Sequence, residues 1–258
     1  MRDPIVNIAV NAARQAGNTI VRALDRLDAI QITQKRPNDF VTEIDQQVEK
    51  EIIHIIRKAH PNHGILGEEG GEIPGDDFTW IIDPIDGTRN FIHGFPQFAV
   101  SIGIRYKKKI EHGVIYDPLR QELFTATRGK GARLNERRIR VSKRNKLEDC
   151  LLGMGFRASK QDTHAITLLE EILPVSDIRC FGAATLDLAY VAAGRLDAFF
   201  ESGLKIWDLA AGTLLIKEAG GLVCDLDGSD NYLKSGNVIA GNPKILKMLL
   251  KIFKISPI

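Results

Sequence analysis

The chain has 258 residues, of which 44% are hydrophobic and 26% charged, a composition typical of a folded globular protein. Its 35 basic and 33 acidic residues leave a net charge of +2, so the overall charge identifies no partner. No apolar run approaches the ~18 residues that a membrane-spanning helix needs, and we therefore expect no membrane association.

The three cysteines, Cys150, Cys180 and Cys224, are scattered, odd in number and set in apolar surroundings. This usage argues against a disulfide framework or a zinc site and favours reduced, structural thiols. The chain opens with a helical pattern and not with a signal peptide. We therefore expect a cytoplasmic protein.

The first residues predict an amphipathic helix followed by a short strand. Asp3 and Pro4 suit the N-cap and the first helical position, and apolar residues then recur every 3.6 positions until near Leu27. Residues 29–33 have the character of a strand. Residues 35–39 are polar and contain turn formers, which predicts a loop.

A second helix is predicted directly after Val41 and Thr42, with Asp45 in its first turn. The helix dipole stabilises a carboxylate at this position. From the residue alone, this interpretation of Asp45 is stronger than a catalytic one.

Residues 64–67 predict a brief strand that runs into Glu68 and Glu69. Two adjacent glutamates usually mark a solvated loop. Here they follow an apolar strand, as Asp83 does further on, so they are candidates for the same sheet edge. Residues 71–77 predict a mobile surface loop.

The segment 80–91 begins as an apolar strand and ends in a polar turn. Pro84 cannot donate a ladder hydrogen bond, so we expect the strand to end there. Gly87 provides the conformational freedom for a sharp turn, and Thr88 suits the N-cap of a short helix that begins just after it.

Two carboxylates, Asp83 and Asp86, flank this bend, and the carbonyl of Ile85 lies between them. Such a cluster is unfavourable without a cation, because like charges at short range repel. Mg²⁺ prefers oxygen ligands of this kind, and the N–H groups of Gly87 and Thr88 suit a phosphate. A plain surface turn explains the same composition, and only the rest of the chain decides between the two interpretations.

Several strands with tight connections follow. Residues 98–106 alternate apolar and polar, residues 110–116 return, and residues 122–127 form the next strand. The pattern predicts an antiparallel meander that continues as a turn over residues 129–135.

Residues 128–146 contain nine Lys or Arg and one acid, Glu136. One interpretation is a surface that binds a polyanion such as RNA, with Arg179 as a further candidate. The other is a solvated sheet edge, where basic residues prevent unwanted strand pairing. No stacking aromatic residues interleave with the charges, which favours the edge.

The remaining chain alternates strands and helices, which predicts an α/β part after the antiparallel one. The predicted strands cover residues 151–155, 178–181, 196–200, 222–224 and 238–240, and the predicted helices cover residues 163–173, 184–193, 207–220 and 243–253. Asp208 sits at the start of one of these helices beside Trp207, with small residues behind it that permit a close approach. A capping aspartate is the common alternative.

Together these motifs resemble the Mg²⁺-dependent, lithium-sensitive phosphatase superfamily, and within it the inositol monophosphatases. The two signatures are residues 83–91 and 207–212, supported by residues 67–69 and 41–45, in the order and approximate spacing of that family. Further segments resemble its bacterial extragenic-suppressor branch, namely 38–42, 116–118, 122–129 and 186–194. The resemblance implies an α+β and α/β chain folded as a layered α-β-α-β-α sandwich, a single domain over residues 1–258 with halves 1–147 and 148–258, and a homodimer.

The resemblance also implies roles for individual residues. Glu68, Asp83 and the Ile85 carbonyl would bind a first Mg²⁺, and Asp83, Asp86 and Asp208 a second, with a weaker third ion on Glu68 through waters. Thr88, with Asp45 and Glu68, would activate the attacking water. The substrate would contact Asp86, Gly87, Thr88, Gly182, Ala183, Ala184 and Glu201. Two positions depart from the common pattern: Arg89 follows Thr88, and Ala183 replaces a hydroxyl residue.

Two hypotheses follow from different functional classes. The first is Mg²⁺-dependent hydrolysis of small phosphate monoesters, with myo-inositol 1-phosphate ahead of fructose 1,6-bisphosphate and 3′-phosphoadenosine 5′-phosphate. The absence of a P-loop argues against a kinase or NTPase. The second is an interaction protein of the transcription antitermination machinery on ribosomal RNA operons, because the bacterial branch includes such members.

Overall fold

The central strands carry consecutive apolar residues whose side chains point alternately to the two faces, so each of two sheets buries both of its faces and three hydrophobic cores result. On β5 (Phe78–Asp86), for example, Trp80 and Ile82 face one core whereas Ile81 faces the next. The structure, a computed structural model, describes residues 3–36, 39–155 and 169–255.

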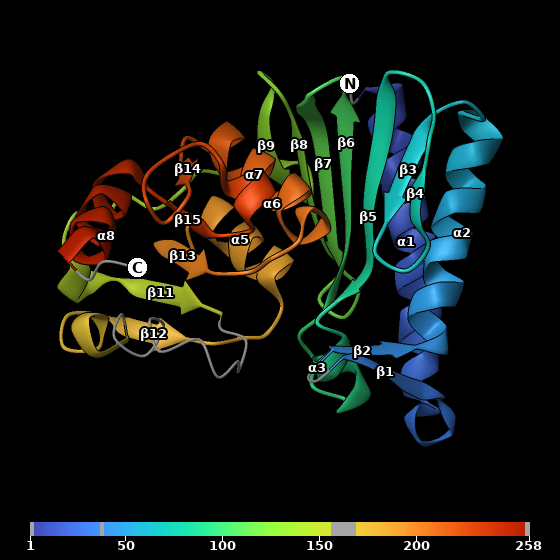
Figure 1. The fold of residues 1–258 in the computed structure, drawn as a ribbon, viewed down its shortest axis with the longest axis horizontal. Helices are drawn as coiled ribbons and strands as arrows, with labels where there is room; N and C mark the ends of the chain where they lie inside the picture. Colours follow the sequence, from blue (N-terminus) through green and yellow to red (C-terminus); the bar gives the residue numbers. More distant parts are fainter. Residues whose placement is uncertain (1–2, 37–38, 156–168, 256–258) are drawn as a thin grey trace.

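The layers are helix, sheet, helix, sheet, helix, as expected for the α-β-α-β-α sandwich (Figure 1). The first pair of helices covers the outer face of the large sheet, the second pair lies between the sheets, and the last helix covers the small sheet. In that order they are α1 (Pro4–Leu24) and α2 (Glu43–Ala59), α5 (Ala184–Ala192) and α6 (Ile206–Glu218), and α8 (Pro243–Ile255). None of the helices described is long and apolar enough to cross a membrane.

The large sheet has eight strands in the order β10-β9-β8-β7-β6-β5-β3-β4. The predicted antiparallel meander is confirmed, and only β3 and β5 pair in parallel. The strands are β3 (Gly64–Gly67), β4 (Gly71–Ile73), β5 (Phe78–Asp86), β6 (Ala99–Tyr106), β7 (Lys109–Asp117), β8 (Glu122–Thr127), β9 (Gly131–Leu134) and β10 (Arg137–Arg138).

Two loop predictions are wrong in this sheet. Residues 71–77 were expected to form a loop, but Gly71–Ile73 pairs with β3; all three residues are exposed, so no alternation marks the strand. The predicted turn at residues 129–135 contains β9, whose four residues are too few to show a period.

The small sheet has five strands in the order β12-β11-β13-β15-β14. They are β11 (Leu151–Met154), β12 (Asp177–Arg179), β13 (Ala198–Glu201), β14 (Leu222–Cys224) and β15 (Val238–Gly241), close to the predicted ranges. The predicted helix over 163–173 lies partly outside the described residues, of which 169–172 are helical. The short helix α7 (Tyr232–Ser235) was not predicted.

The N-terminal boundaries differ from the predicted ones. The helix α1 ends at Leu24, and a 3-10 turn at Leu27–Ala29 occupies the start of the expected strand. The strand β1 (Ile32–Arg36) therefore begins later and pairs with β2 (Asp39–Thr42). Of the cysteines, Cys150 and Cys224 are buried, but Cys180 is exposed, contrary to the expectation of apolar surroundings.

Helix α6 approaches the large sheet closely because glycines face it. A Cβ atom on Gly103 or Gly113 would lie under 3.0 Å from Ala210 or Ala211. This contact fixes the distance between the large sheet and α6, the helix whose first turn carries Asp208.

We expect Gly113→Ala to lower the free energy of unfolding by about 1–3 kcal/mol, because overpacking displaces backbone that has no room to yield. The urea midpoint measures this loss. Lys108→Ala, in the exposed turn of the same hairpin, is the control and should leave the midpoint unchanged. An unchanged midpoint for Gly113→Ala would show that α6 is free to move.

Candidate active site

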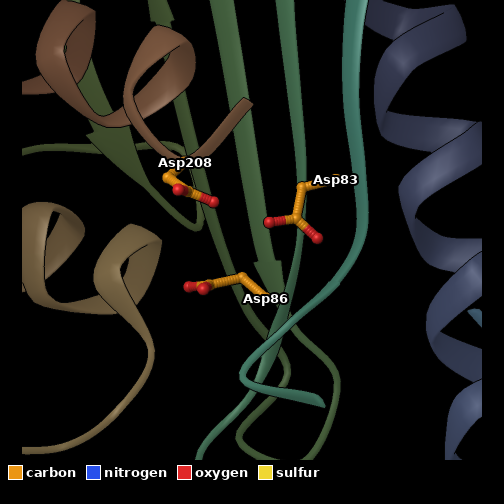
Figure 2. A group of neighbouring side chains, drawn as sticks. All are labelled: Asp83, Asp86 and Asp208. Carbon is orange, nitrogen blue, oxygen red and sulfur yellow. The ribbon is translucent and has the colours of Figure 1, made fainter. Parts of the chain in front are cut away.

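Three buried carboxylates meet where β5 ends and α6 begins. Asp83, Asp86 and Asp208 are 1%, 9% and 7% exposed, and each offers an oxygen within 4.8 Å of the others. Figure 2 shows the three side chains pointing toward one another from the two elements. The structure therefore joins two motifs that lie more than a hundred residues apart in the sequence.

A bulge places Asp83 and Asp86 on the same side of the strand. The predicted end of the strand at Pro84 is wrong, because β5 continues to Asp86. Asp83 pairs with Ser101 and Asp86 with Ala99, so three steps on β5 match two on β6. Residues three apart on a regular strand face opposite sides, and the extra residue corrects this. Proline is tolerated at a bulge, where a ladder hydrogen bond is missing anyway.

Thr88 does not cap a helix, contrary to prediction. It is the first residue of α3 (Thr88–Ile92), and the N-cap is Gly87 in a left-handed conformation with φ 90°. A Cβ atom at Gly87 would meet the Gln97 carbonyl at 2.8 Å, so both the conformation and the space require glycine. The Thr88 hydroxyl lies 3.0 Å from Asp45 Oδ1 and 3.0 Å from the Ile85 carbonyl.

Asp45 connects helix α2 to this site. Its Oδ2 accepts hydrogen bonds from the Thr42 amide and hydroxyl at 2.8 and 2.5 Å, and its Oδ1 accepts from Thr88. The Asp45 amide donates in turn to the Thr42 hydroxyl oxygen at 3.3 Å, which completes a capping box. The helix-dipole interpretation is therefore incomplete. Burial raises the pKa of Asp45 to about 6, although these hydrogen bonds lower it.

Glu68 lies beside Asp83 at the same sheet edge, because β3 and β5 run in parallel. The Glu68 amide donates to the Ile82 carbonyl at 3.1 Å. Burial raises the pKa of Asp83 well above its usual range, and the charge of the nearby Glu68 is the next largest cause of this rise.

The N-terminus of α5 contacts the carboxylate cluster from the other side. Asp86 Oδ2 accepts from the amide and the hydroxyl of Thr185 at 2.7 and 2.6 Å. The side-chain amide of Asn90 (Nδ2) lies within hydrogen-bond distance of the carbonyls of Gln97, Phe181 and Gly182, at 2.7, 2.8 and 3.2 Å. Neither residue was singled out from the sequence, although Asn90 lies inside the first signature.

The predicted hydroxyl-binding residues flank this contact. Gly182 lies in the turn before α5, Ala183 is its N-cap, and Ala184 is its first residue. Glu201 ends β13 on the neighbouring sheet, and its carboxylate occupies the space that a Cβ atom on Gly155 would need. Burial raises the pKa of Asp187 well above its usual range, and the charges of Asp86 and Glu201 raise it further.

The donor set fits a hard cation such as Mg²⁺. Burial and the nearby charge of Asp208 raise the pKa of Asp86 to about 7, despite the hydrogen bonds from Thr185. Within the described part of the chain, the buried Oδ1 of Asp83 has no hydrogen-bond partner. An all-oxygen cluster with an orphaned buried oxygen is the environment that a bound divalent ion stabilises.

The sequence profile of the Inositol monophosphatase family matches residues 1–256. The chain belongs to this family. It is 52% identical over 256 residues to the Nus factor SuhB of Pseudomonas aeruginosa, which covers 96% of this chain and 94% of that protein. The likeness to the bacterial branch is thereby confirmed.

Solved structures agree with the family assignment. The extragenic suppressor protein suhB of Bartonella henselae superimposes with a TM-score of 0.96 at 45% identity, over 98% of this chain and 99% of that one. The inositol monophosphatase from Anabaena gives a TM-score of 0.87 at 35% identity, over 98% and 96% of the two chains.

We expect Mg²⁺ to raise the melting temperature of the metal-free protein more at pH 8 than at pH 6. Folded Asp86 keeps its proton up to about pH 7, whereas in the unfolded chain the pKa is near 3.8. The folded protein thus binds more protons in this window, and its stability falls as pH rises through it. Mg²⁺ displaces the same protons, so its binding strengthens as pH rises.

Calorimetry in two buffers of different ionisation enthalpy counts the protons released by Mg²⁺. Asp86→Asn is the control, and it should release fewer protons than the wild type. Equal Mg²⁺ stabilisation at both pH values, with no proton release, would contradict a carboxylate-based cation site.

Proposed function

We propose that this protein hydrolyses small phosphate monoesters at the Asp83–Asp86–Asp208 centre with Mg²⁺, and that myo-inositol 1-phosphate is its preferred substrate. The observation that carries the proposal is the juxtaposition of three buried carboxylates with the hydrogen-bonded pair Thr88 and Asp45. The family and its inositol monophosphatase structures support a phosphatase. Fructose 1,6-bisphosphate and 3′-phosphoadenosine 5′-phosphate are the alternative substrates.

We assign the cation ligands to Asp83, Asp86, Asp208, Glu68 and the Ile85 carbonyl. Bound Mg²⁺ supplies positive charge for the phosphate and lowers the pKa of a coordinated water. Because a phosphate dianion repels anionic groups, four acids at this site are compatible with such a substrate only when cations balance them.

The Thr88–Asp45 pair is suited to orient the attacking water. The Thr88 hydroxyl donates a hydrogen bond to Asp45 Oδ1, so its oxygen can accept a hydrogen bond from the water, and the proton that the water loses would pass through Thr88 to the Asp45 carboxylate. The pKa of Asp45, raised to about 6, lies close to the range in which a carboxylate exchanges protons with water near neutral pH. We assign Glu68, with Asp45, to the activation of the same water.

The remaining assignments concern the substrate. The amides of Gly87 and Thr88 would bind phosphate oxygens, and Asp86, Gly182, Ala183, Ala184 and Glu201 would contact the hydroxyls of the leaving group. Ala183 offers only its backbone, so hydroxyl recognition depends on the main chain and on Glu201. Arg89 is exposed, and we assign it no role. A homodimer and a cytoplasmic location are retained as proposals.

We expect Thr88→Ala to lower kcat roughly 10²–10⁴-fold without weakening Mg²⁺ binding, because it removes a proton-transfer group and no ligand. Thr88→Ser, which keeps the hydroxyl, is the matched control and should retain most activity. Phosphate release is measured from inositol 1-phosphate, 2′-AMP and the two alternative substrates, with and without Li⁺.

Mg²⁺-dependent, Li⁺-inhibited release that favours inositol 1-phosphate and disappears in Asp83→Asn supports the proposal. A folded protein that binds Mg²⁺ and releases phosphate from none of these substrates would refute it.

A second candidate is an interaction role in transcription antitermination, which the name of the Pseudomonas relative favours. Within the basic segment 128–146, β9 and β10 form one edge of the large sheet, in line with the edge interpretation, whereas residues 139–146 form no strand. Several of its cations are paired, since Arg128 contacts Glu111 and Arg144 contacts Asp197. Arg137 and Arg138 on β10 are exposed, and they are the part of this edge best placed for an acidic partner.

We expect Arg137→Glu combined with Arg138→Glu to weaken binding of single-stranded RNA and to leave phosphate release unchanged, because lost phosphate contacts weaken affinity and its salt dependence together. Fluorescence anisotropy at two salt concentrations measures this. Asp83→Asn is the reciprocal control. Unchanged RNA affinity in the double variant would remove the basic edge from any such role.

A further inference from the structure

A further buried acid, Glu49, lies outside the carboxylate cluster and holds the turn that carries Glu68. It is located on α2, and its side chain is 3% exposed. One carboxylate oxygen accepts a hydrogen bond from the Glu69 amide at 2.9 Å, and the other accepts one from the Gly70 amide at 2.6 Å. A single carboxylate thus satisfies two successive amides of the turn after β3.

The turn is shaped around this carboxylate. A Cβ atom on Gly67 would lie under 3.0 Å from Cδ and both oxygens of Glu49, so only glycine leaves room for it. Glu68 follows Gly67 directly, and its own amide donates to the Ile82 carbonyl. The backbone of Glu68 is therefore fixed on one side by β5 and on the other by Glu49.

Helix α2 contacts both Thr88 and the turn that carries Glu68, the two groups to which we assign activation of the water. Asp45 and Glu49 are four residues apart, which places them on the same helix face one turn from each other. Asp45 accepts a hydrogen bond from Thr88, and Glu49 accepts two from the Glu68 turn. One rigid element thus sets the separation of Thr88 and Glu68.

We propose that Glu49 is a positioning residue that fixes the 68–70 turn so that Glu68 faces Asp83 and the cation. This inference rests on the proposed function for the role of Glu68 and extends it to a residue that touches neither substrate nor metal. A carboxylate is required because two amides need two acceptors. A glutamine offers one acceptor and turns its NH₂ group toward the second amide.

We expect Glu49→Gln to accelerate amide hydrogen exchange at Glu69 and Gly70 and to weaken Mg²⁺ binding about 10–100-fold, the range typical of lost outer-shell support. Amide exchange and calorimetric Mg²⁺ titration of the full chain are the two readouts. Glu43→Gln, the same change at an exposed position of α2, is the matched control and should alter neither.

A second pair of variants tests the same contact by a different change. Gly67→Ala alone should weaken Mg²⁺ binding, because its methyl group displaces the Glu49 carboxylate. In a Glu49→Ala background the space is open, so adding Gly67→Ala should have little further effect. This cycle decides the question if Glu49→Gln does not fold.

The outcomes separate the inference from the function on which it rests. Fast exchange at Gly70 with unchanged Mg²⁺ affinity would overturn the positioning role, and so would additive effects in the Gly67 cycle. A wild type that protects these amides and yet binds no Mg²⁺ would refute the proposed function, and the role toward a cation with it, while leaving the anchored turn in place.

Discussion

The repulsion among Asp83, Asp86 and Asp208 is the constraint on which the rest of the structure depends. Burying several carboxylates together is unfavourable because each loses solvation and each destabilises the charge of the next. The raised pKa values of Asp83 and Asp86 express that cost. Thr185 donates to one oxygen of Asp86, and the Lys205 amide donates to one oxygen of Asp208. Within the described residues the buried Oδ1 of Asp83 has no hydrogen-bond partner, so the cluster is an environment that a bound cation would stabilise.

Backbone features place β5 and α6 around the cluster, and two carboxylate side chains of α2 hold the neighbouring groups. The bulge in β5 turns two carboxylates to one side, and glycines opposite α6 bring Asp208 to the sheet. Helix α2 contributes through its first two turns, where Asp45 and Glu49 reach Thr88 and the Glu68 turn. Short, rigid connections of this kind suit a site whose ligands need accurate positions.

The parts of the structure that the sequence predicts well are those with a strict period. The amphipathic helices and the meander repeat their apolar residues over many positions, so their patterns are evident without tertiary information. The predictions fail where a tertiary contact overrides a local rule. Pro84 does not end its strand because the bulge makes its missing donor unimportant. Thr88 does not cap its helix because Gly87, in a left-handed conformation, takes the N-cap position and Thr88 is already the first helical residue.

The candidate site shows the same division. Glu68, Asp83, Asp86 and Asp208 lie in family motifs and are therefore recognisable in the sequence. The structure brings the three aspartates together. Glu49 and Thr185 have no such signal, because each acts through hydrogen bonds with segments distant in the chain. Asn90 lies inside the first signature, but its hydrogen bonds to the segment before α5 are evident only in the structure. An isolated Glu at a buried helix position has the same appearance in a sequence whether it holds a turn or only occupies space.

The two candidate functions are compatible because they occupy different parts of one sheet. Five strand-to-strand steps separate β10 from β5, which at about 4.8 Å per step places the basic edge roughly 24 Å from the strand that carries Asp83. That separation is about three times the screening length of about 8 Å at physiological ionic strength. The field of Arg137 and Arg138 is therefore small at the carboxylates, and a charge change at one location does not shift the chemistry of the other. A fold of this size can hold a hydrolytic centre and a docking edge that vary independently.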